Sequence, residues 1–181
     1  MKPLKNKITM LALFLLATAF VAPHDRIYPE TLDWDTHFRG KPDANSQYAA
    51  VTNTIWQYGY TAKTRGNNLT IDFSFLGGVD ADKSWVKRER ISNKNTSRIL
   101  LNHEQGHVYI NFLLLKNGEQ ILRNQQYTIQ NYKRLVDKTA KELSKFYNNM
   151  QDRYDEETKH GSDLEAQQRW NSFFESELSK L

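Results

Sequence analysis

One apolar segment, interrupted by a short polar run, constrains the fold of this chain more than any other feature. Residues 99–101 and 108–115 are mostly Ile, Leu, Val and Phe, and the run His103-Glu104-Gln105-Gly106-His107 lies between them. Burying histidine and glutamate side chains costs free energy unless they have polar partners. The segment is therefore expected to be a buried helix whose polar residues have a specific task.

The helix is predicted to run from about Ser97 to Asn117. Thr96 or Ser97 can cap its first turn, and Gly118 is well placed to end it. Gly106 would then lie inside the helix, where glycine costs about 1 kcal/mol relative to alanine. The absence of a side chain there would let another segment approach closely.

The spacing of the two histidines points to a metal site. Four residues apart on a helix, His103 and His107 lie on one face and can both reach one zinc ion. Glu104 leaves the helix about 100° away from His103, beside the metal and not on it. This is the arrangement of the H-E-x-x-H motif, in which two histidines bind zinc and the glutamate acts as general base.

A catalytic zinc needs a third protein ligand. The chain has no cysteine, so the ligand must be a histidine or a carboxylate, and we prefer His160, because an antiparallel second helix would bring it near His103. Glu142, inside that helix, is the main alternative. His24 and His37 are the other histidines, and the remaining carboxylate candidates are Glu119, Asp155 and Glu157. Tyr154 is either an oxyanion donor or the aromatic end of the helix.

The rest of the chain predicts an α+β fold. Residues 49–63 are rich in β-branched and aromatic residues, residues 69–75 alternate apolar with polar, and Gly66-Asn67-Asn68 between them is a turn signal, which together predict an antiparallel hairpin ended by Gly77-Gly78. A short strand is expected near residues 31–35 and a loop at 84–86. Helices are expected at about 128–153 and from Ser162 onward, where Ser162 and Glu165 form a capping box. Strands followed by helices favour α+β.

The N-terminus has the pattern of a secretory signal peptide. Three lysines precede an apolar run from Ile8 to Val21, and Ala17-Thr18-Ala19 fits a cleavage site. We expect residues 1–19 to be removed and residues 20–181 to form one exported domain, periplasmic or extracellular. The run is too short for a comfortable membrane span, which needs about 20 apolar residues.

Charge argues against a nucleic-acid partner. The chain has 25 basic and 21 acidic residues, and three of the basic residues, Lys2, Lys5 and Lys7, lie in the leader. The remaining 22 basic residues against 21 acidic ones give a net charge of +1, which is no basic surplus. The local cluster Lys87-Arg88-Glu89-Arg90 is expected to be solvated loop surface.

Several motifs resemble the bacterial domain-of-unknown-function family 922, described as predicted secreted zinc-dependent proteases. The resemblance extends over nearly the whole mature chain, and its most specific parts are Leu100 to His107 and the later Tyr154-Asp155-x-x-Thr158-x-His160-Gly161. The family pattern has Phe-Asp-Ile after the second histidine, whereas this chain has Val108-Tyr109-Ile110. The other matching stretches are 32–34, 38–43, 46–52, 84–86, Gln168 and Trp170.

These observations lead to one favoured function and two alternatives. The favoured function is a zincin-like metallopeptidase of α+β fold, with zinc on His103, His107 and His160, Glu104 as general base, and a peptide or protein substrate paired with a sheet edge. The first alternative is a zinc-stabilised binding or scaffolding module without turnover. The second is hydrolysis of an amide in a cell-wall polymer, which the motif does not distinguish from peptide hydrolysis.

Overall fold

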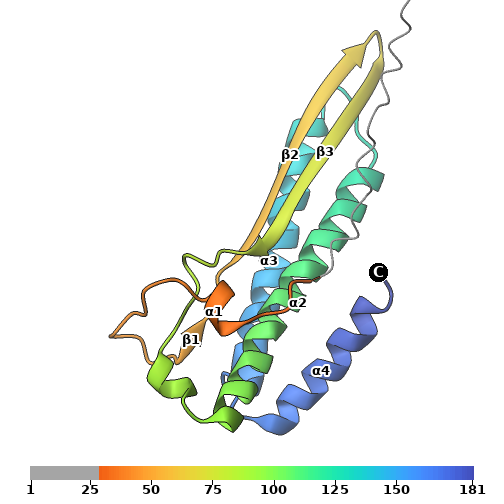
Figure 1. Cartoon of the computed structure of the whole chain (residues 1–181). Helices are drawn as coiled ribbons and strands as arrows, with labels where there is room; N and C mark the ends of the chain where they lie inside the picture. Colours follow the sequence, from red (N-terminus) through yellow and green to blue (C-terminus); the bar gives the residue numbers. More distant parts are fainter. Residues whose placement is uncertain (1–28) are drawn as a thin grey trace, which may run out of the picture.

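The computed structural model describes residues 29–181, so the expected leader and His24 lie outside the described residues. An antiparallel hairpin precedes three long helices, which confirms the predicted α+β class (Figure 1). Within the described residues, no helix is long and apolar enough to cross a membrane. In chain order the elements are α1 Trp34–His37, β1 Ala50–Val51, β2 Thr54–Arg65, β3 Asn68–Val79, β4 Trp85–Val86, the 3₁₀ helix η1 Arg88–Ile91, α2 Lys94–Asn124, α3 Tyr132–Thr158 and α4 Leu164–Leu178.

The central helix α2 is longer than predicted at both ends. Its N-cap is Asn93, whose side chain accepts hydrogen bonds from the backbone N–H groups of Asn95 and Thr96. Gly118 does not end the helix, which was the prediction. A Cβ at Gly118 would lie 3.2 Å from the ring of Trp56, so this glycine makes room for an aromatic side chain of β2.

The hairpin of β2 and β3 has the predicted pairing and turn. Arg65 pairs with Asn68 across the two-residue turn Gly66-Asn67, and pairing continues to Thr54 with Val79, beyond the glycines expected to end the hairpin. Because side chains alternate along a strand, one face carries the aromatic residues and packs on α2 and α3. Phe73, Leu122 and Val136 are the buried residues at this end of the molecule.

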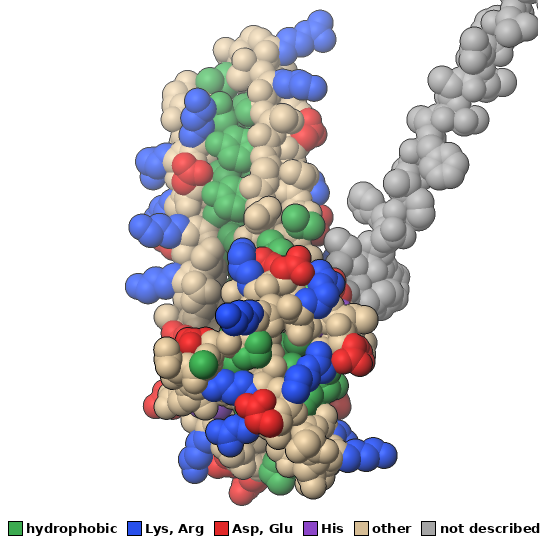
Figure 2. Space-filling view, turned by 60° about the vertical axis from the view of Figure 1, so that its left-hand side comes forward, with side chains coloured by type: hydrophobic (Ala, Val, Ile, Leu, Met, Phe, Trp, Pro, Cys, Tyr) green, Lys and Arg blue, Asp and Glu red, His purple; other side chains and the backbone are tan. Residues whose placement is uncertain are grey.

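The surface near the hairpin differs from the rest of the molecule. Figure 2 shows a stripe of hydrophobic side chains in the upper part of the molecule, with Lys and Arg side chains along its edge. Tyr58 and Tyr60 of β2 are only partly buried, whereas the basic side chains of α3 are exposed, at Lys133, Arg134, Lys138, Lys141 and Lys145.

At the opposite end, β1 pairs with β4 in a second, very short antiparallel sheet. The segment predicted as a loop at 84–86 therefore contains a strand. The short strand predicted at 31–35 is wrong, because Asp33 caps the one-turn helix α1 by accepting hydrogen bonds from two backbone N–H groups. Trp34 of that helix is buried against α2, and its indole N–H donates to Ser97 at 3.0 Å.

Helices α3 and α4 pack with α2 around the largest core cluster, which includes Ile110, Leu114, Tyr154, Trp170 and Phe174. The predicted end of the second helix at 153 is wrong, because α3 continues for another turn to Thr158. The last helix is capped by Asp163 and not by Ser162, one residue later than predicted.

Candidate metal centre

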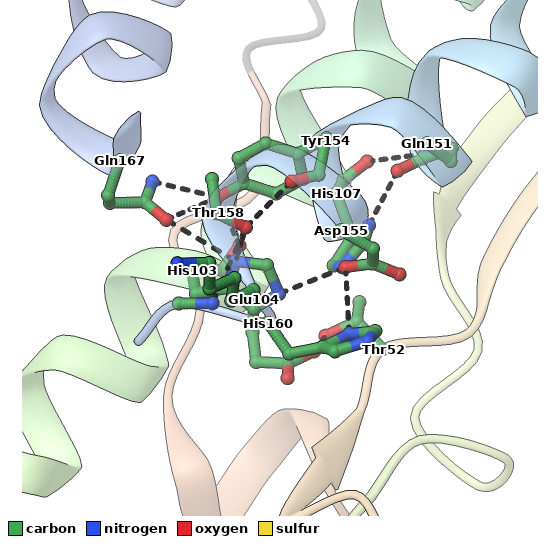
Figure 3. A network of polar contacts seen from close by, with 12 residues as sticks. Thr52, His103, Glu104, His107, Gln151, Tyr154, Asp155, Thr158, His160 and Gln167 are labelled. Atoms are coloured by element: carbon green, nitrogen blue, oxygen red, sulfur yellow. Dashed lines mark hydrogen bonds and ion pairs between the residues drawn. The ribbon is translucent and has the colours of Figure 1, made fainter. Parts of the chain in front are cut away.

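Three side chains form a group that can hold a metal ion. His103 and His107 project from α2, and Asp155 projects from the last turn of α3 toward them (Figure 3). The Nε2 atoms of the two histidines lie 3.1 and 3.0 Å from the same oxygen, Oδ1 of Asp155. His103 is almost fully buried, and the side chains of His107 and Asp155 are partly accessible from the cleft. The motif histidines thus converge on one point, as their spacing predicts.

The outer nitrogen of His107 is fixed by Gln151. The amide N–H of Gln151 donates to the backbone carbonyl of His107 at 3.1 Å, so its oxygen faces Nδ1 of the same residue at 2.6 Å. A neutral His107 therefore carries its proton on Nδ1, which leaves a lone pair on Nε2.

His103 is held in a similar way. Its Nδ1 lies 3.3 Å from both the amide oxygen of Gln167 and the hydroxyl oxygen of Thr158. The hydroxyl of Thr158 donates to the carbonyl of Tyr154 at 2.7 Å, so it is free to accept from the ring. Polar groups behind the ligating nitrogens are usual at metal sites, because they fix the tautomer and the ring orientation.

The inward-facing atoms of this group are all electron-rich. With each Nδ1 donating outward, two Nε2 lone pairs face one carboxylate oxygen at about hydrogen-bonding distance. Such an arrangement is favourable only with a proton or a metal cation between the atoms. Burial alone would lower the pKa of His107, but the hydrogen bond with Asp155 and the charges of Glu104 and Asp155 outweigh it and raise that pKa. For the carboxyl group of Asp155 the directions are reversed. Burial alone would raise its pKa, but the contacts with the two histidines hold that pKa well below its usual range.

Glu104 lies beside the metal group and not in it. It is buried, and its Oε2 accepts a hydrogen bond of 2.6 Å from the hydroxyl of Thr52, the residue that follows β1. Ionised oxygens accept the shorter and stronger hydrogen bonds, so this contact fixes the carboxylate. Thr52 was not singled out as a site residue by the sequence, because it comes from a segment 52 residues away.

Gly106 allows the close approach that the sequence predicts, and the approaching residue is Tyr154 of α3. A Cβ at position 106 would lie 2.2 Å from the hydroxyl oxygen of Tyr154. That hydroxyl is buried and donates to the carbonyl of His103 at 2.8 Å, and Gln167 also contacts it. Burial raises the pKa of Tyr154. The phenol therefore joins α2 to α3 and is not free as an oxyanion donor, which excludes the first of its two suggested roles.

His160 lies near the metal group without being part of it. Its Nδ1 is 3.4 Å from Oδ1 of Asp155, and its ring packs against that of Tyr48 with centroids 4.7 Å apart. Lys159, His160 and Gly161 have positive φ in succession, a conformation that is uncommon for residues other than glycine. Gly161 packs on His103, where a Cβ would lie 2.7 Å from Cβ of the histidine. The loop thus holds His160 over the cleft.

The other candidates lie away from this group. His37 is on α1 and contacts Thr36, whereas Tyr109 packs against Phe174 of α4, so it does not support the metal ligands. Three carboxylates have other partners on the outside of the helices. These are Glu119 with Arg123, Glu142 with Lys138, and Glu157 with the indole of Trp170.

Two cavities meet at the metal group. The larger, about 740 Å³, runs from His107 along α2 toward its N-terminus. The smaller, about 240 Å³, runs in the opposite direction along α2. Both are lined by Thr52, His107 and Asp155, and the segment around β1 forms one wall.

Residues 28–161 match a family described as bacterial proteins of unknown function (DUF922), and the chain belongs to that family. The match runs through the end of α3 and contains the whole metal group, which agrees with the resemblance found in the sequence. No curated protein and no solved structure is significantly similar to the chain.

Proposed function

We propose that this protein is a zinc-dependent hydrolase of peptide bonds. The observation that carries the proposal is the convergence of His103, His107 and Asp155 on one point beside the buried carboxylate of Glu104. Two imidazoles and one carboxylate are a known ligand set of catalytic zinc, with a fourth position left open for water or substrate. Ligands about 2.0–2.1 Å from a tetrahedral zinc are about 3.4 Å apart. The two histidine Nε2 atoms lie 3.1 and 3.0 Å from Oδ1 of Asp155, which is close to that value.

In this proposal Asp155 is the third ligand, and His160 lies beside it. The sequence favoured His160 for that position, but the group of three donor atoms found within 4.8 Å of one another among residues 29–181 includes Asp155 and not His160. His160 is placed on the wall of the cleft, where it can contact a substrate.

Zinc would supply a Lewis acid and lower the pKa of bound water to about 7. Glu104 would accept the proton of the attacking water and pass it to the departing amine. The hydroxyl of Thr52 supports this role, because it occupies one carboxylate oxygen and orients the other. Positioned acid–base groups typically contribute on the order of 10²–10⁴ in rate.

The cleft supports an extended substrate. A chain lying across the metal group would enter one cavity on each side, because the two cavities share three lining residues. One edge of β1 is bonded to β4, and the wall that contains β1 borders the larger cavity, where an extended peptide could add as a further strand. An active-site helix beside a substrate-binding strand is a zincin-like arrangement, which we include in the proposal.

The decisive experiment compares Glu104→Gln with the parent protein. The variant is expected to fold and to retain zinc but to lose nearly all cleavage in a broad peptide library, and chelation should abolish cleavage by the parent. Glu142→Gln makes the same change on an exposed surface and should have no effect. If the variant loses zinc as well, Glu104 is a ligand or a structural residue. If the zinc-loaded parent cleaves no peptide, the result favours a zinc-stabilised binding module.

Export is part of the proposal and has its own test. The exported protein is expected to begin near Phe20, after Ala19, and N-terminal sequencing would show this. An intact Met1 on protein recovered outside the cytoplasm would contradict it.

A further inference from the structure

The two cavities beside the metal group differ in their charge. The smaller is lined by neutral amide and hydroxyl groups, including Thr54, Asn111, Asn148 and Gln151, apart from the shared His107 and Asp155. The larger is lined by the basic side chains of Arg90 and Lys159, and by His160. Its only carboxylates, Glu104 and Asp155, lie at the metal end.

Arg90 is the basic side chain best placed to bind a negatively charged group in the larger cavity. It lies in η1 at the far end of the larger cavity, and within residues 29–181 its side chain has no ion-pair partner. The neighbouring Arg88 is engaged, because it binds the carboxylate of Asp35 at 2.9 Å and the backbone carbonyl of Trp34. Lys159 lies 3.6 Å from Asp163, so its charge is partly matched.

Helix α2 gives a scale for the part of the larger cavity between its Arg90 end and the metal group. Thr96, which lines the cavity with Arg90, precedes His103 by seven residues on the same helix. At 1.5 Å per residue this is about 10 Å along the helix axis. An extended peptide advances about 3.3 Å per residue, so this span corresponds to about three substrate residues.

We infer that the substrate is an extended peptide with an acidic side chain about three residues from the cleaved bond, bound by Arg90. The inference rests on the proposed function for the position of the cleaved bond. A guanidinium presents two parallel N–H donors to a carboxylate, which makes arginine well suited to this recognition. Apolar contacts with Ile99 and Leu100 on the cavity wall would hold the intervening residues.

The experiment uses fluorogenic decapeptides that the parent protein cleaves, with Glu, Gln or Lys placed at each position on either side of the cleaved bond. At one position about three residues away, kcat/KM for Glu should exceed that for Gln about two- to fivefold, as expected for a charge pair with the exposed Arg90. Arg90→Glu should reverse the preference to Lys. Arg98→Glu is the matched control, because Arg98 is exposed on α2 outside the cavity, and it should leave the preference unchanged.

A binding measurement separates this inference from the proposed function. A library of labelled decapeptides with Glu, Gln or Lys at each position, chosen without regard to cleavage, is titrated against the zinc-loaded Glu104→Gln variant, with and without Arg90→Glu, and followed by fluorescence anisotropy. Tighter binding of the Glu peptides that Arg90→Glu abolishes supports the inference, even if the parent protein shows no turnover and the proposed function fails. Equal binding of Glu and Gln peptides, or a preference that Arg90→Glu leaves unchanged, overturns it.

Discussion

The two halves of helix α2 are buried in different ways. The first half carries buried polar side chains, and each is matched by a partner from another segment, such as Asp155 for the histidines and Thr52 for Glu104. The second half is buried mainly by apolar contact, with Leu122 fully inaccessible beneath the hairpin, and its buried polar residue Asn111 donates to the carbonyl of Ile55. Apolar burial requires only area, whereas polar burial requires partners with defined geometry. The same helix thus serves stability at one end and a candidate reaction at the other.

The largest expected effect tests whether the hairpin end contributes only to stability. Leu122→Ala should lower the free energy of unfolding by about 2–5 kcal/mol, because it leaves a cavity between α2, β3 and α3. Zinc affinity of the folded protein should not change. Chemical denaturation and zinc titration of the same preparation would measure both quantities, and a loss of zinc affinity would show that the two halves are coupled.

At the metal end of α2, substitutions are expected to lower zinc affinity more than stability. Removing a group behind a metal ligand typically reduces affinity about 10–100-fold, so removing the ligand itself in Asp155→Ala should reduce zinc affinity by at least about a hundredfold. His160→Ala should reduce it much less. Competition with a chromophoric chelator gives both values. A larger loss for His160→Ala than for Asp155→Ala would restore His160 as the third ligand.

Alanine substitutions at two glycines of α2 allow a direct comparison of its two halves. Gly106→Ala places a methyl group against the hydroxyl of Tyr154 and should cost about 1–3 kcal/mol of stability, as overpacking usually does. At Gly118 the nearest atom is 3.2 Å away, and the gain in helix propensity of about 1 kcal/mol offsets the crowding. Gly118→Ala should therefore be nearly neutral. Thermal unfolding of both variants checks this, and equal losses would contradict the difference.

The sequence predicted the features that depend on local pattern. Histidine spacing placed two metal-binding side chains on one face, and alternation with a turn signal predicted the hairpin. The errors arose where a distant partner decided the outcome. Glycine is common just after the end of a helix, which is why the sequence predicted an end at Gly118. In the structure Gly118 lies within α2, and Trp56 of β2 packs against it.

Asp155, one of the carboxylate candidates, was ranked below His160 for a similar reason. Asp155-Glu156-Glu157 places negative charge near a helix C-terminus, which is unfavourable and suggests an earlier end. In the structure, the last turn of α3 contacts α2 through Tyr154 and Thr158. This turn also brings Asp155 to the two histidines. These contacts join segments about 50 residues apart, so no local pattern reports them.

The smallest expected effect concerns Thr52, which connects the β1 wall of the cleft to the metal end of α2. Its hydroxyl donates to Glu104 at 2.6 Å, and Thr52→Val keeps the shape while removing the donor. A hydrogen bond to a charged group contributes about 1.5–3 kcal/mol, and the lower end of this range corresponds to a fall in kcat of about tenfold, which is the expected effect. Zinc affinity should change little, because Thr52 does not contact a proposed ligand, and KM should change little, because valine keeps the shape that Thr52 presents to the two cavities. Thr52→Ser restores a hydroxyl at the same position and should recover most of kcat. If the Ser variant loses as much activity as the Val variant, a hydroxyl at this position is not sufficient, and the hydrogen bond alone does not account for the effect. If both retain full kcat, the carboxylate of Glu104 is positioned by the helix alone.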